Sequence, residues 1–356
     1  MNGLAINDIR RIIENRTITA SAPCRIDMGG TLDIGCFYYP LSFLNPCTFN
    51  IAIDMRTRIE IMPHRPGYIR ISSRGFEDAE YRMDELPFRH PMGLMFAIAA
   101  HFHIDGIHID IASASPPRSA LGGSSAAAVA LIAAFSRILT IAGQPEIPLE
   151  RIPLLAHAIE EGVAGVPCGL QDQLAAAYGG INAWYWHGKG ADSLYRRHPV
   201  ASEKGRTCFK AQILLAYCGI PHESVNINSQ WVQQFLSGKF RSHWAGIIRC
   251  TNAFIDAVSV ANISEAVRQM NQETAIRLEM TPDVFDDIGN LLFETACNNG
   301  CGARFTGAGG GGCIWALGES GDIADLKPLW ESILSKRGGA GLLDFDIDDE
   351  GVKICD

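Results

Sequence analysis

The chain has 356 residues, of which 47% are hydrophobic and 19% are charged, and its 30 basic and 39 acidic side chains give a formal net charge of −9. This composition is typical of a globular enzyme, and the length favours two domains over one. Because no run of Lys or Arg interrupts the acidic balance, nucleic acid is excluded as an expected partner.

The first half of the chain mixes strands and helices. In chain order we expect strands at 17–26, 47–62 (with a turn near Asp54–Met55) and 68–73, a helix at 91–103, a strand at 107–113, an apolar helix at 129–141, a helix at 149–163, a short helix at 172–178 and a strand at 181–186.

Residues 187–207 are polar and irregular, and we place a domain boundary there or soon after the strand expected at 211–217. The remainder is predicted to be helical from about 224 to 299, with breaks near Gly238, Asn262 and Pro282, followed by a strand, glycine loop and strand at 302–317, a helix at 322–335 and a strand at 341–347. Because the order is not a strict βαβ alternation, the fold class is predicted to be α+β, with domains at 1–205 and 206–356.

Eleven cysteines without a Cys-x-x-Cys pair indicate reduced, mostly buried thiols of a cytoplasmic protein. Residues 1–17 lack the apolar segment of a signal peptide, and the apolar stretch at 126–142 is interrupted by Ser136 and Arg137. We therefore expect no membrane partner. The oligomeric state is left open between monomer and homodimer. No Cys or carboxylate pattern accompanies the three neighbouring histidines, so they do not predict a metal site: His101, His103 and His108.

The most informative stretch is Pro116–Ala128, which reads PPRSALGGSSAAA and leads directly into the apolar helix. Small residues at a helix start leave backbone N–H groups uncovered at the positive end of the helix, where phosphate oxygens bind. An ordinary helix cap is the alternative interpretation. A Walker A loop is excluded, because no Gly-Lys-Ser/Thr follows.

A second glycine-rich stretch, Thr306–Gly312, contains Gly-x-Gly-x-x-Gly, the dinucleotide-binding fingerprint. That fingerprint has to open a helix, whereas Cys313–Leu317 has the character of a strand. We therefore expect a glycine-rich hairpin that approaches a second loop or a ligand, rather than a nicotinamide-binding fold.

Carboxylates occur at three further places. Asp172 precedes a short Ala-rich helix, where it is either a helix cap or a carboxylate aimed into a cleft. Glu160 ends the preceding helix and would ordinarily be a solvated charge. Asp27 and Asp33 follow the first strand together with Arg25, in a loop that is suited to binding sugar hydroxyls or to forming a surface turn.

Together these segments resemble the GHMP kinases over nearly the whole chain. Residues 22–27 (APCRID) are similar to the first motif of the family, residues 116–127 to its phosphate-binding motif, and residues 304–313 to its third motif. The stretch at 171–180 (QDQLAAAYGG) is most similar to the sugar-kinase branch, which includes the D-glycero-D-manno-heptose phosphate kinases and fucokinase.

The resemblance implies an α+β fold of two domains, the first like ribosomal protein S5 domain 2 and the second ferredoxin-like, with ATP and Mg²⁺ bound in the cleft between them. Asp172 matches the catalytic aspartate, and Arg25 matches a basic residue near the transferred phosphoryl group. Glu160 and either Ser124 or Ser125 match the magnesium ligands. ATP-binding candidates are Pro117, Leu121, Gly122, Gly123, Ser124, Ser125 and Ala126, and substrate-binding candidates are Asp27, Gly30, Asp33, Gly309 and Gly310.

The chain also departs from the family pattern. Ala120 stands in place of a usual Gly and Gly123 in place of a usual Ser, which leaves the choice between the two serines open. Arg118 is unusual in a phosphate loop. Gly169–Leu170 differs from the pair expected in the sugar branch, which leaves the acceptor open.

The first expectation is therefore a kinase for a sugar or sugar phosphate, with a heptose 7-phosphate as the leading acceptor. Other acceptors considered are fucose, galactose, a uronate, and alcohols of the mevalonate or amino-acid type. A sensor that binds sugar and ATP without turnover and a nicotinamide-dependent oxidoreductase are the remaining alternatives.

Overall fold

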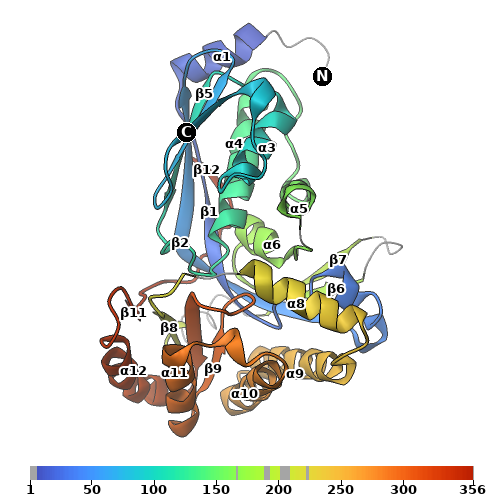
Figure 1. Cartoon of the computed structure of the whole chain (residues 1–356), viewed down its shortest axis with the longest axis vertical. Helices are drawn as coiled ribbons and strands as arrows, with labels where there is room; N and C mark the ends of the chain where they lie inside the picture. Colours follow the sequence, from blue (N-terminus) through green and yellow to red (C-terminus); the bar gives the residue numbers. More distant parts are fainter. Residues whose placement is uncertain (1–5, 166, 188–192, 201–208, 222–223, 356) are drawn as a thin grey trace.

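The structure is a computed structural model that describes residues 6–165, 167–187, 193–200, 209–221 and 224–355 (Figure 1). Its strands are β1 (Ile18–Met28), β2 (Cys47–Pro63), β3 (Tyr68–Ser73), β4 (Ala79–Arg82), β5 (Ile107–Ser113), β6 (Ile181–Trp186), β7 (Tyr195–Pro199), β8 (Ile213–Tyr217), β9 (Gly302–Phe305), β10 (Cys313–Leu317), β11 (Gly341–Leu342) and β12 (Lys353–Cys355). Its α-helices are α1 (Ile6–Asn15), α2 (Gly35–Tyr38), α3 (Gly93–Phe102), α4 (Gly123–Ile141), α5 (Arg151–Ala164), α6 (Gln171–Tyr178), α8 (Ser224–Leu236), α9 (Arg241–Ser259), α10 (Ile263–Met280), α11 (Asp287–Asn298) and α12 (Ser320–Leu334).

The larger sheet has eight strands in the order β12-β1-β2-β5-β3-β4, with β6 paired to the first part of β2 and β7 paired to β6. The strands β3 and β5 are parallel neighbours, and the other pairs are antiparallel. The long strand β2 therefore connects the two halves of the sheet, and helices α3 to α6 lie along its upper half in Figure 1.

The expected turn near Asp54–Met55 is wrong, because β2 continues through it as a bulge. Pro23 of β1 pairs with Arg56, whereas the next residue, Cys24, pairs with Ile53, so Asp54 and Met55 are the extra residues. The backbone groups freed by the bulge are used by the end of the chain: Asp54 N–H donates to the Asp346 carbonyl at 2.9 Å. A bulge stabilised by a segment almost 300 residues away leaves little local signal in the sequence.

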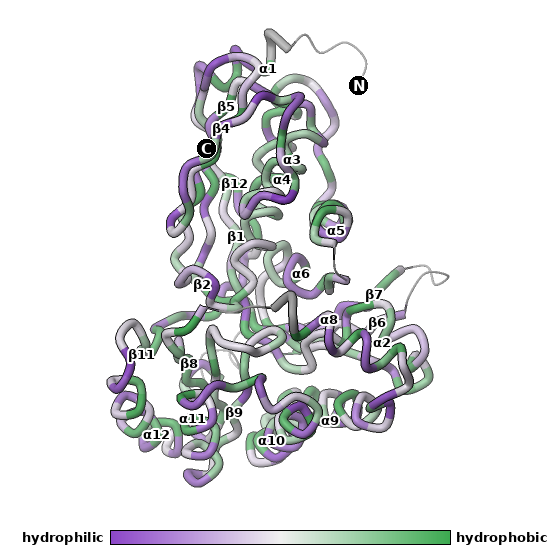
Figure 2. The backbone as a smooth tube through the Cα atoms, in the orientation of Figure 1, coloured by the Kyte–Doolittle hydropathy of each residue, from purple (hydrophilic) through white to green (hydrophobic). Residues whose placement is uncertain are grey.

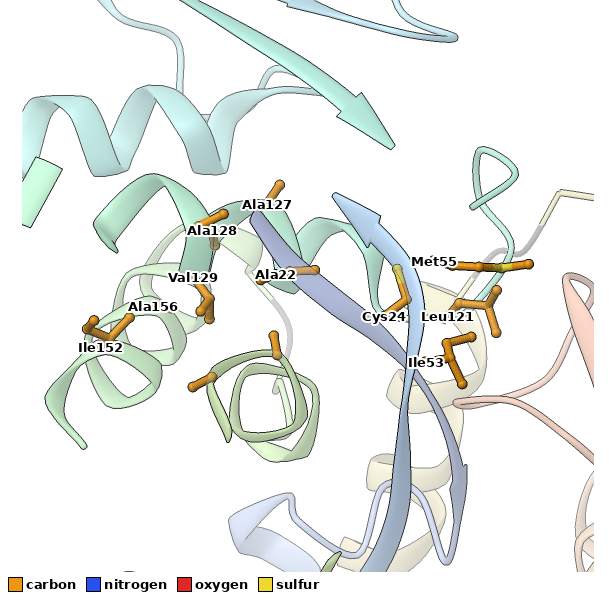
Figure 3. Packing of buried hydrophobic residues seen from close by; sticks show 14 of the residues in the cluster. Ala22, Cys24, Ile53, Met55, Leu121, Ala127, Ala128, Val129, Ile152 and Ala156 are labelled. Atoms are coloured by element: carbon orange, nitrogen blue, oxygen red, sulfur yellow. The ribbon is translucent and has the colours of Figure 1, made fainter. Parts of the chain in front are cut away.

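Helix α4 is the central core element of the upper part. The side chains from Ala126 to Ala130 are at most 4% exposed, and Figure 3 shows Ala127 and Val129 in the same cluster as Ala22 of β1 and Ile152 and Ala156 of α5. Among the described residues, α4 is the helix that is long and apolar enough to cross a membrane, but 78% of its apolar stretch is buried inside the protein. Close packing of short side chains fixes the position of the α4 N-terminus.

The smaller sheet has four antiparallel strands in the order β11-β8-β10-β9. Helices α10 to α12 pack against it and α9 packs on α10 in the lower part of Figure 1. These helices show both purple and green stretches in Figure 2, as expected when one face contacts the core and the other contacts solvent. The core of this part contains the fully buried Trp231, Trp244 and Trp330, together with Leu32 and Phe37 from the segment after β1.

The two parts of the molecule thus exchange chain segments. The segment after β1 packs into the smaller part, and β12 returns to pair with β1 in the larger sheet. The expected boundary between residues 205 and 206 lies outside the described residues, so the division into 1–205 and 206–356 stays a proposal.

Most predicted elements are confirmed, including β5 and β6 with their predicted bounds and the helix breaks near Gly238, Asn262 and Pro282. The strand expected at 341–347 is wrong in length, because only Gly341–Leu342 pairs with β8. The predictions also missed β7, which lies in the segment expected to be irregular. Four of its five residues are exposed and two are arginines, so it lacks the apolar alternation by which strands are recognised.

A buried row of alternating charges lies between the two parts of the molecule. Glu273 of α10 accepts from Arg277 Nε at 2.9 Å and from Arg304 Nε of β9 at 2.9 Å. Arg304 Nη1 in turn donates to Asp27 Oδ2 of β1 at 3.1 Å, and Asp27 Oδ1 lies 3.5 Å from Arg25 Nη1. We call Arg277, Glu273, Arg304, Asp27 and Arg25 the charge row.

The charge row also fixes the loop after β1. Arg277 Nη2 donates to the Gly30 carbonyl at 2.7 Å and Nη1 donates to Thr31 Oγ1 at 3.1 Å, while the rings of Trp231 and Trp244 flank its guanidinium. Burial opposes the ionisation of Glu273, but Arg304 and Arg277 together hold its pKa below the ordinary value. Glu273 is therefore charged, and removal of its charge would leave two buried arginines without their shared partner.

Replacement of Glu273 by Gln keeps the shape and removes the charge that separates two buried arginines. We expect a loss of about 3–5 kcal/mol in the free energy of unfolding, as found when one partner of a buried pair is removed. The control is Glu265→Gln on the same helix, whose pairing with Arg268 is solvent-exposed and should matter far less. Urea denaturation compares the variants, and equal stabilities would contradict a structural role for the charge row.

Candidate active site

A cavity of about 440 Å³ opens between the two parts of the molecule. It is lined by the turn after β3, the start of α3, the loop at 114–122, the first turn of α4, the ends of α5 and α6 that face each other, α8 and the start of the glycine-rich loop. The side chains of Arg25, Asp33, Ser125, Glu160 and Asp172 all line this cavity, although they are spread over almost 150 residues of sequence.

The start of α4 presents bare backbone to the cavity. Its N-cap residue, Gly122, has a φ of 78°, and no side chain caps the helix. The N–H groups of the first turn, at Gly123–Ser125, have no partner within the helix and lie at its positive end. A side chain at position 122 would place its Cβ only 3.3 Å from Asp172 Oδ2. Glycine is therefore required here both for the left-handed backbone and for the close approach of Asp172.

The departures from the family pattern in this loop have visible consequences. Ala120 stands at a φ of 62° and Arg118 at a φ of 53°, in the left-handed region that glycine adopts more easily. Arg118 is exposed at the rim of the cavity. Gly123 in place of a serine leaves Ser124 and Ser125 as the hydroxyls of the first turn, of which Ser125 is 5% exposed and Ser124 is open to solvent.

Asp172 and Arg25 form a bidentate ion pair. Arg25 Nε lies 2.8 Å from Asp172 Oδ1 and Nη2 lies 2.9 Å from Oδ2. Burial opposes the charge of Arg25, but Asp172 and Asp27 hold its pKa above the ordinary value. The Asp172 side chain keeps 24% of its surface exposed toward the cavity, so its remaining lone pairs can accept from a ligand.

Glu160 and Ser125 offer hard oxygen ligands near the start of α4. Ser125 Oγ lies 3.2 Å from Glu160 Oε2, and Gln173 Nε2 donates to the same oxygen at 2.6 Å. Burial and the neighbouring Asp172 raise the pKa of Glu160. Of the two serines predicted from the sequence, Ser125 is the one in contact with Glu160.

Asp33 is held by the start of α6. Its Oδ2 accepts from the Gln171 N–H at 2.9 Å, whereas its Oδ1 is buried without a hydrogen-bond partner. Gly169 makes room for this carboxylate, because a Cβ at that position would lie 1.8 Å from Asp33 Oδ2. Burial raises the pKa of Asp33 to about 7. An unpartnered carboxylate oxygen facing a cavity is a typical ligand-binding feature.

Four predicted substrate-binding residues do not line the cavity in this structure. Asp27 is fully buried, and its carboxylate accepts from Gly307 N–H at 2.7 Å and from Arg304. The Gly30 carbonyl accepts from Arg277. The N–H groups of Gly309 and Gly310 donate to the carbonyls of Thr306 and Val284. In this structure these four residues position the loops around the site.

The remaining predicted residues lie either at the cavity or in the core. Pro117 and Leu121 line the cavity, whereas Ala126 lies in the core of α4 just outside it. The glycine-rich loop passes into strand β10, which confirms the strand expected after it. The described residues contain no group of three or more His, Cys, Asp or Glu side chains that could hold a metal ion.

Buried thiols among the cysteines include Cys24, Cys47 and Cys313, as expected.

Several cavity residues were missed by the sequence analysis. Gln173 lies one residue beyond Asp172 and could have been found from that motif. Asn228 lies within helix α8, far from any motif, and nothing in its neighbourhood pointed to it. The cavity lining also includes Arg74 and four apolar residues that the sequence suggests are ordinary core residues: Phe76, Met92, Leu94 and Met95.

Comparison with known proteins relates the chain to one family. Residues 90–180 match the family model described as the GHMP kinases N terminal domain. A mevalonate kinase from Pyrococcus horikoshii is 24% identical over 321 residues, which cover 84% of this chain and 88% of that protein. A D-glycero-alpha-D-manno-heptose 7-phosphate kinase from Campylobacter jejuni is 25% identical over 244 residues, which cover 67% of each chain.

The fold agrees with this relationship. A crystal structure of a D-glycero-D-manno-heptose 1-phosphate kinase from Bacteriodes thetaiotaomicron superposes with a TM-score of 0.71 at 17% identity, covering 95% of this chain and 99% of that one. The expected two-domain α+β fold is thereby confirmed.

Asp33 should make stability depend on pH. Its pKa in the folded protein, about 7, lies above the ordinary value of 3.8, so the folded state retains a proton that the unfolded state releases. Stability from this group is present below about pH 4 and is lost as the pH rises toward 7, by up to roughly 4 kcal/mol at about 1.4 kcal/mol for each pKa unit. Asp33→Asn should therefore be more stable than the parent protein at pH 8.

The measurement is urea denaturation of both proteins between pH 4 and pH 8. The advantage of Asp33→Asn should grow through this range and vanish at its acid end. A constant difference between the two proteins would show that the Asp33 carboxylate is not the titrating group.

Proposed function

We propose that this GHMP kinase, an enzyme that transfers a phosphoryl group to an alcohol, uses ATP to phosphorylate a hydroxyl group of a sugar or a sugar phosphate. The observation that carries the proposal is the juxtaposition of Gly122 and Asp172. It brings an uncapped helix start and a carboxylate to the same few ångströms of the cavity wall. Phosphoryl transfer needs alignment and charge neutralisation more than covalent chemistry, and both are available there.

The first turn of α4 supplies the donors for the phosphates. The N–H groups of Gly123, Ser124 and Ser125 would bind the β- and γ-phosphate oxygens, and the small side chains allow the phosphates to approach the backbone. Pro117 and Leu121 would shape the path toward the base. The apolar end of the cavity, with Phe76, Met92 and Met95, is the natural place for the base itself.

Asp172 would orient the acceptor. Arg25 occupies one side of its carboxylate, so the remaining lone pairs can accept a hydrogen bond from the acceptor hydroxyl. In a loose transition state the proton leaves late, so that orientation contributes more than basicity. Arg25 would also lie close to the transferred phosphoryl group and offset its charge.

Mg²⁺ fits the donor set of Glu160 and Ser125, because it prefers hard oxygen ligands and completes its shell with phosphate and water. We propose these two residues, with Ser124 as the alternative serine, as its protein ligands. When bound, the ion would neutralise the charge of the β- and γ-phosphates. Gln173 would keep Glu160 in place through its hydrogen bond.

Two other candidate functions have less support. A sensor without turnover would not need the assembled pair of Arg25 and Asp172 or the contact of Ser125 with Glu160. A nicotinamide-dependent oxidoreductase would need the glycine-rich loop to open a helix.

We further propose a cytoplasmic location, small molecules as the only ligands, and a monomer or homodimer.

Asp172→Asn should lower turnover by at least ~10²-fold, the low end of general-base contributions, because the acceptor hydroxyl loses its anionic partner. The affinity for ATP should stay nearly normal, since the first turn of α4 is unchanged. ADP formation with a panel of sugars and sugar phosphates gives the rate, and titration with a fluorescent ATP analogue gives the affinity. Unchanged turnover would remove Asp172 from the mechanism.

Glu160→Gln should raise the Mg²⁺ concentration needed for half-maximal activity by at least ~10-fold, in line with the loss of one charged ligand. The neighbouring Glu161→Gln provides a matched control, because that side chain is exposed and does not line the cavity. Magnesium titrations of both variants make the comparison. The same response in both variants would argue against Glu160 as a ligand.

A further inference from the structure

We propose that the acceptor is an uncharged polyol, a free sugar, selected by Asp33 together with Asn228 and Gln171, and that sugar phosphates and carboxylate-bearing alcohols are poor acceptors. This inference rests on the proposed function and specifies its substrate class. It differs from the heptose 7-phosphate that the sequence favoured, and also from mevalonate.

The cavity has a defined order from one end to the other. Gly75, after β3, adjoins Pro117, because a Cβ at that glycine would lie 3.1 Å from the Pro117 ring. Gly122 then adjoins Asp172, and next to Asp172 the Gln171 N–H donates to Asp33. With the phosphates over the first turn of α4, the base lies toward Gly75 and the acceptor lies toward Asp33. The described residues that line this acceptor end include Thr31, Asp33, Ile34, Gly169, Gln171, Asn228 and Gly307.

The acceptor end contains buried oxygen atoms that lack a donor. Asp33 Oδ1, Gln171 Oε1 and Asn228 Oδ1 are all buried and have no hydrogen-bond partner. The Asp33 and Gln171 side chains belong to residues that are only 5% and 4% exposed, so water does not reach them freely. A carboxamide can turn to present its NH₂ group, but an ionised carboxylate can only accept. A ligand that fits has to bring donors, and sugar hydroxyls are donors.

No free cation accompanies these oxygens among the described residues. The cationic side chains that line the cavity are Arg25, Arg74 and Arg118. Arg25 is already bound to Asp172 and to the Ala120 carbonyl. Arg74 directly precedes Gly75 at the nucleotide end, and Arg118, which directly follows Pro117, is an exposed side chain of the loop at the cavity rim rather than one of the buried groups around Asp33.

A phosphate or carboxylate on the acceptor would therefore lie beside Asp33 without a counterion in the described part of the site. Burying an uncompensated charge is costly, and a second anion would raise the pKa of Asp33 further. Hydroxyl groups carry neither cost. The same oxygen atoms that bind a neutral sugar thus exclude its charged derivatives, which is how polar sites reach high selectivity.

The test uses acceptors in matched pairs that differ in charge: galactose with galacturonate, glucose with glucuronate, mannose with mannose 6-phosphate, and a heptose with its 7-phosphate, plus mevalonate alone. ADP formation is measured with ATP and Mg²⁺ at pH 8, above the Asp33 pKa of about 7, so that this carboxylate is mostly ionised. We expect the neutral member of the best pair to exceed its charged partner by at least ~10-fold in kcat/KM. A charged member as the best acceptor overturns the inference and leaves the kinase activity intact.

If no acceptor is phosphorylated, thermal shift with the same panel, in the presence of ADP and Mg²⁺, decides the matter. Stabilisation by neutral members alone supports the inference even though the proposed function fails. Stabilisation by charged members, by both kinds equally or by neither overturns it.

The Asp33→Asn variant tests whether Asp33 selects the acceptor by charge or only maintains the structure of the site. The variant should raise the KM for the best neutral sugar by at least ~10-fold and narrow the ratio between neutral and charged partners, because Asn no longer repels an anion. Asp325→Asn, on the exposed face of α12, is the matched control. A loss of activity that is equal for both members of a pair would show that Asp33 does not select by charge.

Discussion

The contact between Arg304 and Asp27 is the constraint on which the rest of the site depends. Both side chains are fully buried, so each offsets the charge of the other, and Arg304 also pairs with Glu273. The carboxylate of Asp27 also accepts from the Gly307 N–H and lies beside Arg25. In this way α10 and β9 of the smaller part determine where Arg25, and therefore Asp172, can stand. The active site is assembled only when both parts of the molecule are folded against each other.

Several residues that line the cavity have an environment or a backbone conformation that costs folding free energy. Asp33 has an oxygen without a partner, Glu160 is largely buried with a raised pKa, and Ala120 adopts a backbone conformation that suits glycine. None of these features helps the fold, since each opposes burial or adds strain. They are concentrated where the nucleotide, the metal ion and the acceptor are proposed to meet, as expected when stability is exchanged for preorganisation.

Much of this could be predicted from the sequence, for reasons that differ between residues. Helix α4 and strands β5 and β6 carry strong local patterns, and the Gly122–Ser125 and Asp172 motifs are short and specific. The bulge at Asp54–Met55 and the position of Asp27 depend on partners almost 300 residues away, so local patterns could not reveal them. The sequence predicts Asp27 as a substrate ligand because the residues around it resemble the first motif of the family. Asn228 lies in an ordinary helical stretch, and only the tertiary structure brings it to the cavity.

The central claim is that a nucleotide places its terminal phosphate between the first turn of α4 and Asp172. A crystal structure with a non-hydrolysable ATP analogue and Mg²⁺ tests it most directly. We expect phosphate oxygens bound to the N–H groups of Gly123–Ser125, with the terminal phosphorus facing Asp172 and the base near Phe76. Phosphates bound far from both α4 and Asp172 would contradict it.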